Sequence, residues 1–162
     1  MTKKLIGSMS AMLLPLLPLL PVLAAEPVEF PEYREGLWEA HMQTIDKATN
    51  KKDESSFKVC RSNATEKAAY ERMKTMKDCK FEIQNLGGGK YASTSRCTVG
   101  GSVIESKSRF EITSSSSHSE THTTYTPPLY GKSDDVTTQD QKYVGSCPAG
   151  TKPGRIIPAG GT

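Results

Sequence analysis

Apolar and polar residues alternate along several short segments of the chain, which is the pattern of half-buried β-strands. The clearest case is residues 104–113, where apolar or small side chains alternate with charged ones. The same type of pattern marks residues 36–45, 57–60, 79–84, 90–98, 119–125 and 136–144. Glycine and proline turns separate these segments, so the sequence predicts six or seven strands.

One segment follows a different pattern and predicts a short amphipathic helix. Residues 64–74 are rich in good helix formers, and either Ser62 or Asn63 is a suitable N-cap. Glu66 stands three residues after Asn63, at the position that completes a capping box. The apolar side of this helix is expected to consist of Ala69, Met73 and Met76.

The expected fold class is mainly β, with one short helix. The strands are expected to form an antiparallel, strongly curved sheet or to close into a small barrel, and the pattern leaves both open. Residues 50–54 read as a charged loop and Asp134-Asp135 as a turn. The strand that begins at residue 119 is expected to stop at Thr126-Pro127-Pro128.

The first 25 residues have the layout of a cleavable secretory signal peptide. Lys3 and Lys4 precede an apolar stretch that ends in the small residues Ala24 and Ala25. This stretch is shorter than the ~20 apolar residues of a membrane span, and prolines interrupt it. Cleavage after Ala25, or one residue earlier, is therefore favoured over a membrane anchor, and a periplasmic or secreted protein is expected.

Removal of residues 1–25 would leave 137 of the 162 residues, which is enough for one domain core. That domain is expected at residues 26–147, with a flexible Gly/Pro-rich tail at 148–162. The formal charge would fall from +3 to +1, because two lysines leave with the signal. Nucleic acid is therefore not expected as a partner of the mature chain. Stable membrane insertion is not expected either, because no second apolar segment follows the signal.

The four cysteines have spacings that fit disulfides and neither a zinc knuckle nor a redox pair. Folding the hairpin of residues 79–98 about Gly88 places Cys79 opposite Cys97. Facing residues in such a pair have Cβ atoms ~4.5–5.5 Å apart, which is near the separation that a disulfide needs. We therefore expect the bridge Cys79–Cys97, which leaves Cys60–Cys147.

Four short motifs carry a resemblance to a known family. The domain opens with Gly36-Leu37-Trp38-Glu39, a cysteine precedes the helix, two cysteines flank a Gly-rich hairpin, and Gly145-Ser146-Cys147-Pro148 closes the last strand. Over residues 33–148 the chain resembles the exported bacterial family named domain of unknown function 3617. The resemblance implies an envelope location and an antiparallel β domain with two disulfides. It implies no reaction and no catalytic residues.

His118, Glu120 and His122 form the one cluster of metal-ligand residue types. On a strand these three side chains project from one face, and histidine with carboxylate suits zinc or copper. All three can reach one ion only if the strand bends. The alternative is a polar strand that faces solvent.

No motif in the chain predicts catalysis. The serines at 114–117, His118 and the aspartates at 134–135 lack the strained turn that positions a hydrolase nucleophile. Gly87-Gly88-Gly89-Lys90 joins two strands and is not a phosphate-binding loop. No enzyme activity and no cofactor are therefore expected.

The expected function is that of a non-catalytic binding module for a small ligand or an envelope partner. Trp38, Tyr91 and Phe110 are the large aromatic residues that would either fill the core or line a ligand cavity. One alternative is a structural or interaction component of an envelope or secretion assembly, with residues 113–126 and the tail as contact elements. The other is a metal-binding protein that uses the His-x-Glu-x-His strand.

Overall fold

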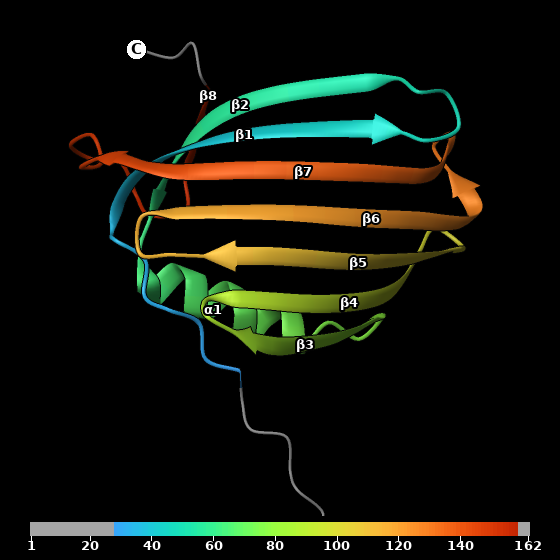
Figure 1. Cartoon of the computed structure of the whole chain (residues 1–162), viewed down its shortest axis with the longest axis horizontal. Coiled ribbons are helices and arrows are strands. Elements are labelled where there is room, and N and C mark those ends of the chain that lie inside the picture. Colours follow the sequence, from blue (N-terminus) through green and yellow to red (C-terminus); the bar gives the residue numbers. More distant parts are fainter. Residues whose placement is uncertain (1–27, 159–162) are drawn as a thin grey trace, which may run out of the picture.

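Eight antiparallel strands form one strongly curved sheet in the computed structural model, which describes residues 28–158 (Figure 1). The sheet order is β3-β4-β5-β6-β7-β1-β2-β8. The elements are β1 (Gly36–Asp46), β2 (Lys52–Arg61), α1 (Asn63–Lys74), β3 (Cys79–Gly87), β4 (Lys90–Val99), β5 (Ser102–Ile112), β6 (Ser116–Leu129), β7 (Lys132–Gly145) and β8 (Ile156–Pro158). The edge strands β3 and β8 do not pair with each other, so the sheet is open and is not a barrel. The predicted signal peptide at residues 1–25 lies outside the described residues.

The β3–β4 hairpin has the predicted register, with Cys79 opposite Cys97. Its two turn residues, Gly88 and Gly89, both have positive φ, as such a tight turn requires. At Gly89 a Cβ atom would lie 2.5 Å from the carbonyl oxygen of Ile112. Glycine at this position therefore allows both the turn and the close approach of β5.

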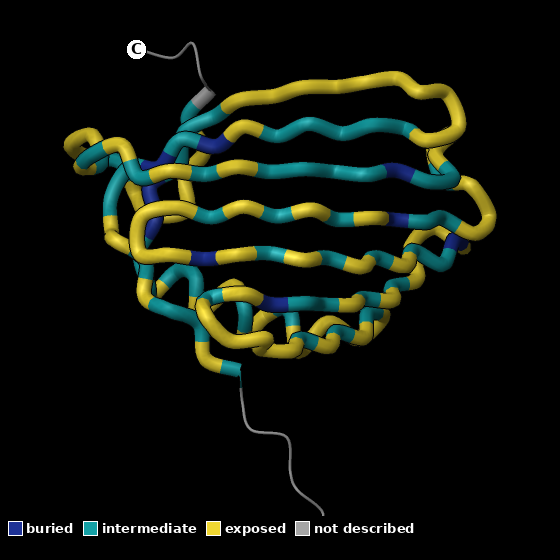
Figure 2. Tube along the Cα trace, viewed as in Figure 1, coloured by how far each residue is buried: buried dark blue, intermediate teal, exposed yellow. Residues whose placement is uncertain are grey.

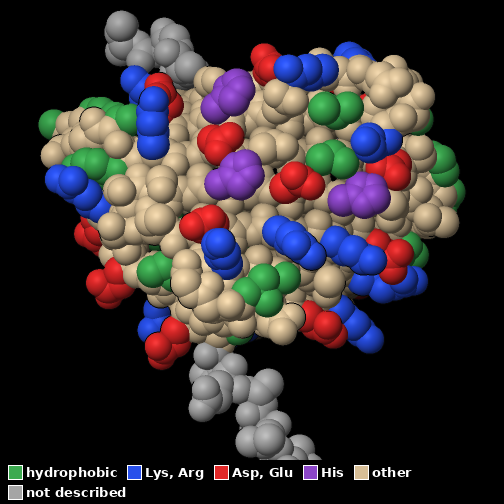
Figure 3. All heavy atoms as spheres, viewed as in Figure 1, with side chains coloured by type: hydrophobic (Ala, Val, Ile, Leu, Met, Phe, Trp, Pro, Cys, Tyr) green, Lys and Arg blue, Asp and Glu red, His purple; other side chains and the backbone are tan. Residues whose placement is uncertain are grey.

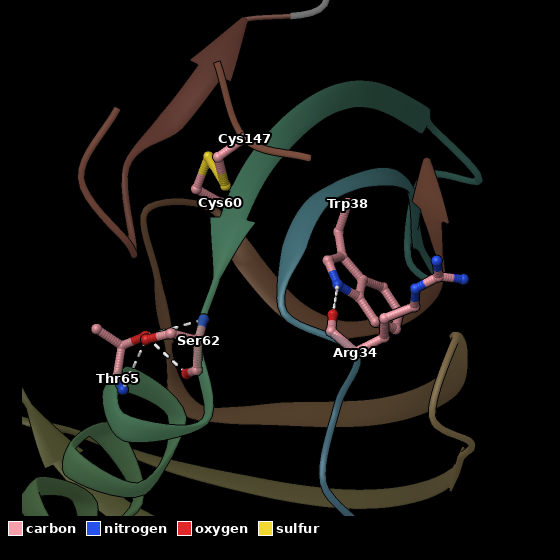
Figure 4. The surroundings of a disulfide bond; sticks show 6 residues. All are labelled: Arg34, Trp38, Cys60, Ser62, Thr65 and Cys147. Atoms are coloured by element: carbon pink, nitrogen blue, oxygen red, sulfur yellow. Dashed lines mark hydrogen bonds between the residues drawn. A yellow bond between two sulfur atoms is a disulfide. The ribbon is translucent and has the colours of Figure 1, made fainter. Parts of the chain in front are cut away.

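Both expected disulfides are present, as Cys79–Cys97 and Cys60–Cys147. The first joins the facing strands β3 and β4. The second connects the end of β2, just before α1, to the segment that follows β7 (Figure 4). It therefore links parts of the chain that are 87 residues apart.

Three boundaries differ from the sequence prediction, because strand pairing extends the elements past local turn signals. β2 begins at Lys52, inside the predicted charged loop. β6 continues to Leu129, and a register shift after Thr124 accommodates its two prolines. Asp134-Asp135 lies within β7, and the turn is formed by Tyr130-Gly131, which both have positive φ.

The segment after Cys147 contributes to the sheet, which corrects the prediction of a flexible tail for its described part. β8 pairs with Phe57–Val59 of β2. The backbone N–H of Gly154 also donates to the carbonyl of Cys60 at 2.7 Å. The strand with which this segment pairs lies about a hundred residues earlier in the chain. The composition of the segment alone therefore does not predict the pairing.

Helix α1 begins at the predicted place, but its cap uses a different partner residue. Ser62 is the N-cap, and its side chain accepts from the backbone N–H of Thr65 while the Thr65 side chain reciprocates (Figure 4). Glu66 was expected to complete the cap. It instead forms an ion pair with Arg61, at 2.9 Å between Oε1 and Nε.

The packing of α1 also differs from the prediction, since no helix residue is buried. Residues 28–35, here called the N-terminal strap, connect the helix to the sheet. Phe30 of the strap packs edge-on against Tyr70 of α1, with ring centroids 5.3 Å apart. The same ring contacts Tyr91 of β4 at 5.0 Å and Phe110 of β5 at 6.3 Å.

The buried core is small and centres on Trp38, whose side chain is fully buried. Its indole Nε1–H donates to the carbonyl of Arg34 at 2.9 Å (Figure 4). Tyr33 packs edge-on against the indole, and the Arg61 guanidinium lies over it. Few positions along the sheet are coloured as buried in Figure 2. The buried hydrophobic residues are Trp38, Ala40, Cys60, Tyr91 and Ile112.

Candidate functional site

The two faces of the sheet differ in chemistry. The inner face carries Trp38, the strap and α1. The outer face is covered with side chains of both charges and holds the three histidines of the chain (Figure 3). Two shallow depressions lie on this outer face, one around His41 and one around His122.

The predicted metal cluster lies on the outer face, with its side chains on one side of β6. Each histidine has a separate carboxylate partner on β7: His118 Nδ1 lies 2.7 Å from Asp140 Oδ1, and His122 Nε2 lies 2.7 Å from Asp134 Oδ1. The two histidines are four residues apart on an extended strand, which separates them by about 13 Å. Residues 28–158 contain no group of three or more His, Cys, Asp or Glu side chains placed to hold a metal ion.

A serine, a histidine and an aspartate also meet on the outer face, and sequence analysis missed them because they come from three strands. Ser56 Oγ lies 3.0 Å from His41 Nδ1, and Asp140 is the register neighbour of His41 on β7. Asp140 is bonded to His118, however, and both Ser56 and His41 are exposed on regular strands. This geometry does not orient a nucleophile as a catalytic triad does.

The inner face contains a row of hydroxyl side chains that crosses five neighbouring strands. One residue from each strand contributes, and each faces the next in register. All five are partly exposed. This set, here called the first hydroxyl row, consists of Ser93 on β4, Ser108 on β5, Thr121 on β6, Thr137 on β7 and Thr44 on β1.

Hydrogen bonds between strands connect the members of this row. Ser108 and Thr121 have their hydroxyl oxygens 2.8 Å apart, and those of Thr44 and Thr137 are 2.9 Å apart. Two residues further along the strands a second hydroxyl row follows, formed by Ser95, Ser106 and Thr123. Within it, the Ser106 and Thr123 hydroxyls are 3.1 Å apart.

The second row ends at a buried carboxylate, Asp135 on β7. The Tyr125 hydroxyl donates to Asp135 Oδ2 at 2.9 Å, and Lys132 Nζ lies 3.6 Å from the same oxygen. Burial raises the pKa of Tyr125 to about 12, and the hydrogen bond to Asp135 and its charge act in the same direction. Asp135 therefore has partners within the protein.

This pKa predicts how stability depends on alkaline pH. The pKa of Tyr125 is about 12 in the folded protein and about 10 when unfolded. The unfolded chain therefore loses this proton first, and the contribution of Tyr125 is lost as pH rises from about 10 to 12. Denaturant unfolding at stepped pH should show a smaller alkaline loss of stability for Tyr125→Phe than for the original protein. An equal loss in both proteins would contradict the assignment.

The three aromatic residues singled out in the sequence lie on the inner face, at different depths. Trp38 and Tyr91 are buried in the core. Phe110 is partly exposed and stacks on Tyr91, with ring centroids 5.3 Å apart and planes inclined by 14°. Because Phe110 stands two residues after Ser108 on the same face of β5, its ring borders the first hydroxyl row.

Charged side chains on the inner face have partners within the protein. Arg61, which is 8% exposed, pairs with Glu66 and donates to Gln141 Oε1 at 2.8 Å. The first hydroxyl row contains no charged residue from β4 to β1. On β2 it meets Asp53, which forms an ion pair with Lys51.

The fold and its two faces define a small disulfide-linked β domain with an open, curved sheet. Residues 33–147 match the family model described as "Protein of unknown function (DUF3617)", so the chain belongs to this family. The match agrees with the family that the sequence resembles. No curated protein matches the chain. No solved structure matches it either.

One observation bears on the compartment. The pair of disulfides fits an oxidising environment outside the cytoplasm. Within the described part of the chain, the single helix lacks the length and the apolar character that a membrane crossing requires.

Proposed function

We propose that this protein is a non-catalytic binding module that acts in the periplasm or after secretion, and that the inner face of its sheet holds the ligand. The observation that carries this proposal is the first hydroxyl row. The middle of an inner sheet face is where a core is normally built. Here it presents partly exposed hydroxyl groups.

Stability alone would favour apolar residues at these positions, because a cross-strand hydroxyl pair contributes only about 0.2–1 kcal/mol. Burying a Val, Leu or Ile side chain stabilises a protein by about 1.5–3 kcal/mol relative to leaving it exposed. Five hydroxyl residues at the centre of the sheet forgo this gain. A surface that is concave, polar and accessible is suited to holding a ligand, and the proposal assigns it that role.

The non-catalytic part of the proposal rests on the outer-face residues Ser56, His41 and Asp140. They are the nearest approach to a nucleophile with a base among residues 28–158, and Asp140 bonds to His118 instead of orienting His41.

A ligand site is also favoured over an assembly role. The segments expected to contact an assembly partner already pair with other strands of the sheet. β6 lies between β5 and β7, and β8 pairs with β2.

The proposal is tested by NMR with threonine methyl groups as reporters of each face. Thr44, Thr121 and Thr137 report on the inner face, and Thr94, Thr124 and Thr138 on the outer face. The probes are dodecanoate, tetraalanine, tetragalacturonate and the neutral tetrasaccharides maltotetraose, cellotetraose and tetra-N-acetylchitotetraose. At least one probe should give saturable shifts of the inner-face methyl signals.

A matched pair of variants provides the control for this experiment. Thr137→Trp places a large ring on the inner face of β7 and should abolish the shifts. Thr138→Trp places the same ring on the outer face of the same strand and should leave them. Saturable shifts confined to outer-face methyl groups, or none from any probe, would contradict the proposed function.

A further inference from the structure

We propose that the ligand of the inner face is a neutral polyhydroxylated chain, an uncharged oligosaccharide, that lies along the first hydroxyl row. This inference rests on the proposed function and adds the chemical class of the ligand. It follows from three features of the row: its hydrogen-bonding capacity, its lack of charge, and the aromatic ring at its border.

The hydrogen-bonding capacity of the row is mixed. Each hydroxyl has one donor and two acceptor positions. In the pairs Ser108–Thr121 and Thr44–Thr137 one O–H is used within each pair. Each pair therefore keeps one O–H and several lone pairs for a ligand. Sugar hydroxyls, which both donate and accept, are complementary to this combination.

The row has the length for an extended ligand. It crosses five strands, and neighbouring strands are about 4.8 Å apart, so it extends for about 19 Å. An elongated molecule can therefore bond to successive strands at regular intervals.

The absence of free charge selects against ionic ligands. An anion would need a cation or several aligned N–H donors, and Arg61 is already paired with Glu66. An acyl chain would have to cover the hydroxyls of the row without bonding to them, and this desolvation is unfavourable. A neutral, hydroxylated ligand meets neither obstacle.

Phe110 supplies the apolar contact that a sugar ring also requires. Its ring is partly exposed next to Ser108 and is held in place by the stack on Tyr91. Aromatic side chains offer a large, rigid apolar surface, on which the C–H face of a pyranose ring packs. The hydroxyl row and this ring together present both kinds of contact.

The test compares Thr137→Val with Thr138→Val. Both changes replace a threonine by an isosteric apolar residue on β7, on the inner and the outer face respectively. The neutral tetrasaccharide that shifts the inner-face methyl signals should bind about five- to tenfold more weakly to Thr137→Val, the loss of one net hydrogen bond. Its affinity for Thr138→Val should be unchanged, and both variants should keep the original thermal unfolding midpoint to within a few degrees.

The probe panel separates this inference from the proposed function. If only dodecanoate or tetraalanine binds to the inner face, the oligosaccharide assignment is wrong and the proposed function remains. Binding of tetragalacturonate with the affinity of the neutral sugars would overturn the requirement for an uncharged ligand. If the two valine variants lose affinity equally, the hydroxyl row is not the site of sugar binding. If no probe reaches the inner face, both proposals fail.

Discussion

Replacing both Cys60 and Cys147 by alanine should lower the free energy of unfolding by ~4.6 kcal/mol, because the bridge closes a loop of 87 residues in the unfolded chain. The bridge Cys79–Cys97 closes a loop of only 18 residues, and the same chain-entropy relation gives ~3.2 kcal/mol. The longer loop should therefore have the larger effect. It also joins the end of β2 to the segment that follows β7, and β1 lies between these two strands in the sheet.

Urea unfolding of the two double-alanine variants measures this difference directly. The comparison uses midpoints and m-values without reductant, with the disulfide-intact protein as the reference. Each variant retains one bridge, so each is the control for the other. A larger loss of stability in the Cys79/Cys97 variant would show that chain entropy is not the dominant contribution.

Trp38→Ala should destabilise the protein by about 3–5 kcal/mol, the range for truncating a buried Trp or Phe. Trp38 is fully buried in a small core, and its indole N–H satisfies the carbonyl of Arg34. The substitution would leave a cavity next to Tyr33 and Tyr143 and would remove the ring beneath Arg61. Few other buried side chains contribute to this core.

The matched control is Tyr130→Ala, which also truncates an aromatic residue but at a position that is 94% exposed. It should change the free energy of unfolding by no more than about 0.5 kcal/mol. Both variants are compared with the original protein by urea unfolding. A loss below about 1 kcal/mol for Trp38→Ala would show that the core is not centred on this residue.

Local chemistry determined the β3–β4 hairpin almost completely. Alternation assigned Phe81 and Ile83 to one face, and the glycines marked the turn. Folding the two strands about Gly88 then predicted the register that pairs Cys79 with Cys97. The sequence also predicted the mainly β fold class, the start of α1 and both disulfides, because each depends on neighbouring residues or on the number of cysteines.

Pairing between distant segments decided what the sequence could not. β8 is a strand because β2 offers it a free edge, and Asp134-Asp135 is extended because β1 and β6 flank it on both sides. At the start of α1 the N-cap is Ser62, so Thr65 occupies the third helical position and Glu66 pairs with Arg61. For β8 and for Asp134-Asp135 the deciding contact comes from a strand that is distant in the sequence.

In the candidate site, too, the sequence predicts the face of each residue and strand pairing decides which residues are neighbours. The alternation of side chains along a strand by itself places Ser108, Thr121 and Thr137 each on the face opposite to their neighbours in the chain. Only the tertiary structure decided that they form one row, because strand order and register place residues that are far apart in the chain side by side. A one-residue change of register in any strand would turn its hydroxyl to the other face, so the row exists only through the assembled sheet.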